Sequence, residues 1–239
     1  MDVTKPTHIA FIISGIITML VAIFFEKFSL IYVQPFTVLT ILIIYFTEKK
    51  EPTSVLYILS QIIGVIGGIL LILGMREHLK AVSILFSFFY IFYLRMMYVR
   101  NVMKKGELKT YFYVALISLP VLYLYYSVIQ TISSELTEVV LYFSVLMFFM
   151  LSYFMTSLYY YIKDKNQSNL WMLIAAINLG FMNIIIVLNE LYMYETMFTV
   201  IVVLCSLFIQ FFVLKFMLYD ENEDDYSLIS TLNDELKNS

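Results

Sequence analysis

The sequence predicts an all-α membrane protein built as a bundle of eight transmembrane helices, and three observations support this fold class. The chain of 239 residues is 62% hydrophobic and only 14% charged, whereas a soluble domain carries about 25% charged residues. Its mean hydropathy is +0.87. Its apolar runs extend for about 20 residues, the length of a helix that crosses a bilayer. A water-soluble globular protein is therefore excluded, because a core of this size cannot hide so much apolar surface.

The apolar runs supply the elements in chain order. Charges and turn residues divide them into eight predicted spans, at residues 8–25, 29–46, 54–74, 81–99, 110–130, 138–162, 168–189 and 193–219. Only residues 26–28 separate the first two spans, so these spans form a tight helical hairpin. Helices are favoured over strands because backbone hydrogen bonds must close within each segment in lipid, and the runs lack the alternation of a barrel. We expect residues 1–219 to form one transmembrane domain.

The basic residues orient the predicted bundle. Of the 15 lysines and arginines, all but Lys27, Arg76 and Lys80 lie at the two chain ends or in the connections after the second, fourth and sixth spans. Basic residues concentrate on the cytoplasmic side of membrane proteins, so this distribution places both termini in the cytoplasm. We therefore expect a multi-pass integral membrane protein of a bacterial inner membrane.

Residues 220–239 form an acidic tail with seven acids and one lysine. A solvated cytoplasmic terminus explains such a block. The alternative is a docking helix that binds a cytoplasmic partner through Ile229, Leu232 and Leu236, and the protein would then be a non-enzymatic membrane anchor or interaction protein. A nucleic-acid partner is excluded, because the chain has no basic, aromatic soluble surface.

Ionisable side chains inside a bilayer are costly and usually functional. The deep parts of the predicted spans contain no Asp, Glu or Lys, which disfavours proton-coupled transporters and leaves a neutral-solute transporter as a weaker alternative. Glu190 lies near the outer end of the seventh span, where we expect a solvated carboxylate. His8, His78 and Cys205 do not have the spacing of zinc ligands, so we predict neither a metal site nor a cofactor.

Four short stretches, spread over nearly the whole chain, resemble one family of membrane enzymes. Residues 32–37 are similar to its Lys-Pro-Leu-Thr entry into the second helix, and residues 66–71 to its Gly-Asp-apolar-Leu-Leu stretch in the third. Residues 86–93 resemble its Phe-x-x-x-His-x-x-Tyr pattern, and residues 180–189 its Ser-Asp-apolar-Ala-Leu-Asn stretch. The family is that of the YhhN-like lysoplasmalogenases, eight-helix proteins that hydrolyse the vinyl-ether bond of lysoplasmalogens. The resemblance implies a membrane lipid as partner, such as a lysophospholipid.

The chain departs from this family at the polar positions. Gln34 stands where the family has lysine, Gly68 and Asn183 where it has aspartates, and Tyr90 where it has histidine. Acid-catalysed ether cleavage needs a proton donor, and neither an amide nor a glycine supplies one at neutral pH. The resemblance therefore implies a lipid-binding protein with weak or lost hydrolase activity. Its candidate lipid-binding residues are Gln34, Tyr90, Tyr93 and Asn183, around a cavity between the second, third, fourth and seventh spans.

Overall fold

Helices make up nearly all of the described chain. The computed structural model describes residues 5–50, 52–101, 108–135, 140–191 and 194–219. Its elements are α1 (Pro6–Phe24), η1 (Lys27–Ser29), α2 (Leu30–Glu48), α3 (Val55–Arg100), α4 (Leu108–Glu135), α5 (Val140–Lys163), α6 (Gln167–Leu191) and α7 (Thr196–Leu218), with no strand in these ranges. Eight helical stretches of the described chain are long and apolar enough to cross a membrane. The predicted fold class is confirmed.

Helix α3 contains two of these eight stretches, Val55–Met75 and Glu77–Arg100. It begins at a conventional cap, because the Ser54 hydroxyl accepts a hydrogen bond from the backbone N–H of Tyr57 at 3.3 Å. Its two arms meet at Gly74, whose φ of 143° and ψ of 112° are non-helical. This conformation is open to glycine and strained for residues with a side chain. Gly74 therefore divides α3 into two separate membrane crossings.

The two arms of α3 run antiparallel and pack closely. A β-carbon at Gly64 would lie 3.4 Å from the ring of Phe89, and one at Gly67 would lie 3.0 Å from the ring of Phe86. From the first of these contacts to the second, both contacting residues lie closer to Gly74, as expected for the two arms of a helical hairpin. The glycines thus let large aromatic rings of the second arm pack against the backbone of the first.

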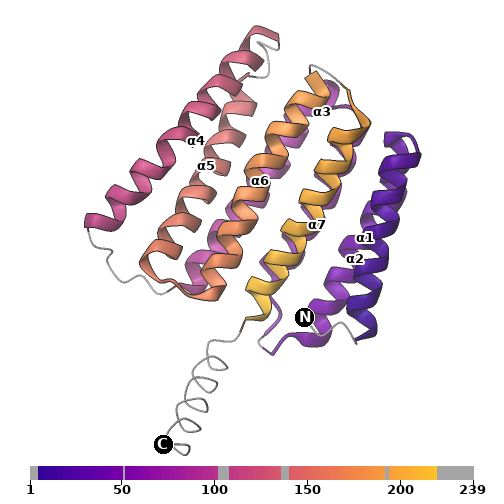
Figure 1. Ribbon diagram of the computed structural model, residues 1–239, viewed down its shortest axis with the longest axis horizontal. Helices are drawn as coiled ribbons and strands as arrows, with labels where there is room; N and C mark the ends of the chain where they lie inside the picture. The colour runs from indigo at the N-terminus through magenta and orange to yellow at the C-terminus, as the bar shows by residue number, and fades with distance from the viewer. Residues whose placement is uncertain (1–4, 51, 102–107, 136–139, 192–193, 220–239) are drawn as a thin grey trace, which may run out of the picture.

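The helices form a broad, flat bundle with α3 behind its main layer (Figure 1). Neighbours in the front layer are α4, α5, α6, α7 and α1 in that order, and α2 packs on α1 and α7. Helix α3 packs mainly on α5 and α2. Helix α4 stands at the edge of the bundle, where α5 is its main neighbour.

The outer surface of the bundle is apolar. The large exposed side chains include Ile13, Ile16 and Leu20 on α1 and Phe112 and Leu119 on α4. Soluble proteins rarely expose apolar surface over several helices in this way, whereas a membrane protein presents it to lipid. The chain is therefore an integral membrane protein with several crossings.

Polar contacts tie helices together at the end of the bundle where α1 begins and α7 ends, which we call the terminal end. The Lys5 ammonium group lies 2.8 Å from the Glu48 carboxylate, joining the start of α1 to the end of α2. The Arg100 guanidinium group donates hydrogen bonds to the backbone carbonyls of Phe216 and Tyr219. We call the opposite end, where α3 turns at Gly74, the hairpin end.

The cytoplasmic position of the termini stays a prediction. Residues 220–239 lie outside the described residues, so the proposed docking helix of the acidic tail also stays a prediction.

Candidate functional site

A cavity lies between α1, α2, α3, α6 and α7. Its cavity volume is about 130 Å³, within about 1140 Å³ of empty space that includes packing gaps and open solvent. The four predicted spans that we expected to enclose a cavity, now α2, the two arms of α3, and α6, all line it. Helices α1 and α7 add walls that the sequence did not indicate.

Helical periodicity places the lining residues on one face of each helix. On α2 they recur at i, i+4, i+7 and i+8, as Leu30, Gln34, Thr37 and Val38. This spacing is that of a single stripe along a helix with 3.6 residues per turn. The faces of the five helices together build a space with two chemically different ends and an apolar middle.

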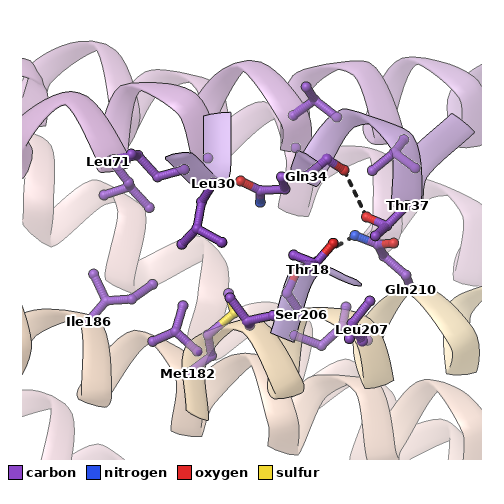
Figure 2. A pocket seen from close by; sticks show the side chains of 18 of the residues that line it. Thr18, Leu30, Gln34, Thr37, Leu71, Met182, Ile186, Ser206, Leu207 and Gln210 are labelled. Carbon is purple, nitrogen blue, oxygen red and sulfur yellow. Dashed lines mark hydrogen bonds between the residues drawn. The ribbon is translucent and has the colours of Figure 1, made fainter. Parts of the chain in front are cut away.

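The middle of the cavity is apolar. Figure 2 shows Leu30, Leu71, Met182 and Ile186 around one half of the space, and Thr18, Gln34, Thr37 and Gln210 around the other half. Thr18 and Thr37 turn their hydroxyl groups back to the carbonyls of Ser14 and Gln34, both at 2.8 Å. Their hydroxyl protons are therefore used within their own helices.

Gln34, Gln61 and Gln210 come from α2, α3 and α7 and line the cavity together; we call this region the amide end. The side-chain nitrogen of Gln61 lies 3.5 Å from the Tyr93 hydroxyl oxygen. The side-chain nitrogen of Gln210 donates to the Ser206 hydroxyl at the same distance. The Gln210 side-chain oxygen is buried and has no hydrogen-bond partner among the described residues. Two long bonds and an unpaired acceptor leave much of the hydrogen-bonding capacity of these amides unused.

Gln34 occupies space made available by Gly68. The Gln34 amide nitrogen lies 2.9 Å from the position that a β-carbon at Gly68 would take. A side chain at residue 68 would therefore have to displace the amide. Both residues line the cavity.

The other end of the cavity, toward the hairpin end of the bundle, is charged. Lys27 and Glu190 form an ion pair there, and both residues line the cavity. The exposed fractions of their side chains are 17% and 14%. The Lys27 ammonium group also donates to the backbone carbonyl of Leu71 at 3.3 Å. We call Lys27 and Glu190 the charged end.

The expectation that Glu190 is a solvated carboxylate is wrong. Its side chain is largely enclosed and paired with Lys27 across the space between α6 and η1. The neighbouring Asn189 is buried as well, and its amide donates to the Thr199 hydroxyl at 3.2 Å. The tight connection between α1 and α2 brings Lys27 over the end of α6, which a single sequence does not reveal. A carboxylate therefore faces one end of a cavity that we expected to contain none.

The structure separates the candidate residues into two groups. Gln34, Gly68 and Tyr93 line the cavity, whereas Tyr90 and Asn183 do not. The Asn183 amide donates to the Tyr90 hydroxyl at 3.0 Å and to the Leu179 carbonyl at 2.7 Å. Asn183 instead lines a second, smaller cavity of about 20 Å³ next to α5.

Helix rotation explains this separation. Consecutive residues on a helix are turned by about 100°. Met182 and Phe89 face the main cavity, so the next residues, Asn183 and Tyr90, point to its side. Their mutual hydrogen bond therefore joins α6 to α3 within the bundle, rather than presenting polar atoms to a ligand.

No family model matches the chain, and neither a curated protein nor a solved structure matches it. The resemblance to the YhhN-like family stays a prediction.

Among the described residues, no group of three or more His, Cys, Asp or Glu side chains could hold a metal ion. The histidine nitrogen of His8 lies 3.1 Å from the Glu48 carboxylate at the terminal end. Cys205 is buried in α7 as a free thiol.

The sequence pattern did not connect Gln61 and Gln210 with Gln34, and it did not assign Lys27 to the site. The available signal was a glutamine on each of three mostly apolar helix faces. Which helix faces meet is decided by packing between segments that are far apart in sequence. A polar residue on an apolar helix face therefore predicts a polar contact but does not identify the residue that it contacts.

Proposed function

We propose that this protein holds a single-chain membrane lipid in its cavity, as a YhhN-like relative of the lysoplasmalogenases with weak or lost hydrolase activity. The observation that carries the proposal is a largely apolar cavity of about 130 Å³ that opens to the surface of a membrane bundle and has neutral amides in its lining. Apolar walls fit a hydrocarbon chain through many small van der Waals contacts, and a few polar groups orient it.

The residues at the family-equivalent positions support weak or lost hydrolysis. Gly68 has no side chain, and the amide of Gln34 fills the space beside it. The Asn183 amide is engaged with Tyr90. Neither position offers a group that transfers a proton at neutral pH, and acid/base catalysis contributes about 10²–10⁴-fold to such reactions. We therefore expect turnover by the family route to be lost.

One observation favours hydrolysis as a second candidate. The Glu190 carboxylate lines the cavity at its charged end. A carboxyl group can act as a general acid or base when it lies within reach of the reacting atoms. Slow ether cleavage assisted by Glu190, rather than by the family-equivalent positions, is the alternative that activity measurements must separate.

Lipid binding is tested with a variant that fills the cavity. Ile186 lines the cavity and is 8% exposed, whereas Ile177 on the same helix is 52% exposed on the outer surface. We expect Ile186→Trp in purified full-length protein to weaken binding of radiolabelled 1-oleoyl lipids at least about tenfold. Ile177→Trp is the matched control and should bind normally. Equal affinity in both variants would contradict a lipid site in this cavity.

Hydrolysis is tested by aldehyde release from a lysoplasmalogen. We expect no release above that of heat-denatured protein. Turnover that disappears in Asn183→Ala would contradict the loss of the family route. Turnover that survives in Asn183→Ala and disappears in Glu190→Gln would establish the second candidate.

A further inference from the structure

We propose that Gln34, Gln61 and Gln210 form a subsite for the hydroxyl groups of an uncharged head group, so that the cavity selects a neutral single-chain lipid of the monoacylglycerol class. This inference rests on the proposed lipid-binding function and adds the chemistry of the ligand and its direction of insertion. The polar head would lie at the amide end, and the chain would extend through the apolar middle toward the charged end.

The first argument is that three amides line the same cavity. They come from three different helices and line one space. Gln61 and Gln210 are 3% and 8% exposed, so both are more than nine-tenths buried. Buried polar side chains in membrane helices normally pair with one another or with backbone. These three instead surround a void, which is an arrangement that a ligand can complete.

The second argument is that the amides lack partners. Each glutamine amide offers two donor protons and an acceptor oxygen with two lone pairs. The Gln210 oxygen has no partner among the described residues, and both recorded bonds of the Gln61 and Gln210 nitrogens are as long as 3.5 Å. Buried polar groups that go unpaired are destabilising. The Gln210 oxygen is itself enclosed, so a bound hydroxyl group, which both donates and accepts, would relieve that deficit once the Gln210 amide turns toward the space.

The third argument concerns charge. Of the residues that line the cavity, Lys27 and Glu190 are the formally charged ones in the described chain, and they lie at the opposite end. On α7 the cavity extends from Thr199 to Gln210, or roughly 16 Å at 1.5 Å per residue. A phosphate or ammonium group among the glutamines would thus be buried without a counter-ion, which is strongly unfavourable.

The charged end is a poorer head-group site because it is already satisfied. Lys27 and Glu190 pair with each other, and Lys27 also reaches the Leu71 carbonyl. A zwitterionic head group would have to open this pair to gain equivalent contacts. At the amide end a neutral hydroxyl group displaces no protein hydrogen bond.

The experiment compares three ligands with the same oleoyl chain: 1-oleoylglycerol, its dimethyl ether without free hydroxyl groups, and 1-oleoyl lysophosphatidylcholine. Binding is measured on the full-length protein in lipid nanodiscs. We expect 1-oleoylglycerol to bind about five- to tenfold more tightly than the dimethyl ether, the difference that one or two good hydrogen bonds supply. Lysophosphatidylcholine should bind more weakly than 1-oleoylglycerol.

The variants Gln210→Met and Gln61→Met keep the length of the side chain and remove its polar atoms. We expect each to reduce the preference for 1-oleoylglycerol over its dimethyl ether by several-fold. Gln167→Met, at the exposed start of α6, is the control and should keep the preference. Thermal unfolding without ligand verifies that all variants are folded.

Two results would overturn the subsite while leaving the lipid cavity intact. The first is equal binding of 1-oleoylglycerol and its dimethyl ether, which would mean that the glutamines hold only water. The second is a preference for lysophosphatidylcholine that disappears in Lys27→Met, which would place the head group at the charged end. By contrast, if none of the three ligands binds in a manner sensitive to Ile186→Trp, the proposed function itself fails.

Discussion

The side-chain nitrogen of Gln34 lies 2.9 Å from the place where a β-carbon on Gly68 would be. A long amide on α2 therefore fills the space that a side chain on α3 would need. In the family that the sequence resembles, a lysine and an aspartate stand at these positions.

This relationship predicts energetic coupling between residues 34 and 68. Gln34→Lys alone places an ammonium group in the cavity wall without an acid, and Gly68→Asp alone forces a carboxylate against the Gln34 amide. The double variant can form an ion pair. We expect a coupling energy of at least about 1 kcal/mol in the direction that favours the double variant. Unfolding of the wild type, both single variants and the double variant in one detergent measures it, and additive effects would refute the coupling.

Removing one residue of the Lys27 and Glu190 ion pair should lower the stability of the protein more than removing both. Lys27→Met leaves an enclosed carboxylate unpaired, and Glu190→Met leaves an ammonium group unpaired. We expect each single change to destabilise the protein by about 3 kcal/mol. The double change to methionine should be much closer to wild type, because no uncompensated charge remains. A double variant as unstable as the sum of the single variants would show that the pair is not the relevant interaction.

Gly74 should resist substitution although it has open space around it. A β-carbon there would meet no atom within 4 Å, yet its φ is 143°. We expect Gly74→Ala to lower the free energy of unfolding by about 1–3 kcal/mol through backbone strain alone. Gly180→Ala is the matched control, because its β-carbon would make an ordinary contact of 3.7 Å with the Tyr125 hydroxyl. It should be neutral or slightly stabilising, since alanine favours helix.

The hydrogen bond between Tyr90 and Asn183 should matter for stability and not for binding. Tyr90→Phe removes the hydroxyl that accepts from the Asn183 amide, while the bond from Asn183 to the Leu179 carbonyl persists. We expect a loss of about 1 kcal/mol of stability. The affinity for a 1-oleoyl lipid should not change, because neither residue lines the main cavity. A tenfold loss of affinity with unchanged thermal stability would place Tyr90 at the ligand instead.

Much of the architecture follows from local pattern. Apolar runs of membrane-crossing length predicted the eight crossings, and a three-residue connection predicted the hairpin of α1 and α2. In α3 the sequence predicted two spans, and the non-helical backbone of Gly74 shows how one long helical element makes both. Each of these inferences uses hydropathy over about 20 neighbouring residues, which depends little on the rest of the chain.

The chemistry of the cavity was decided by packing. Gln34, Gln61 and Gln210 are far apart in sequence, and only the packing of α2, α3 and α7 around one cavity brings all three into its lining. One step of about 100° along a helix separates Met182 inside the cavity from Asn183 beside it. The sequence by itself determined that the chain is a helical membrane protein with few deep charges. The tertiary structure decided that Glu190 faces an enclosed space, because helix rotation and long-range contacts are not encoded in any local stretch.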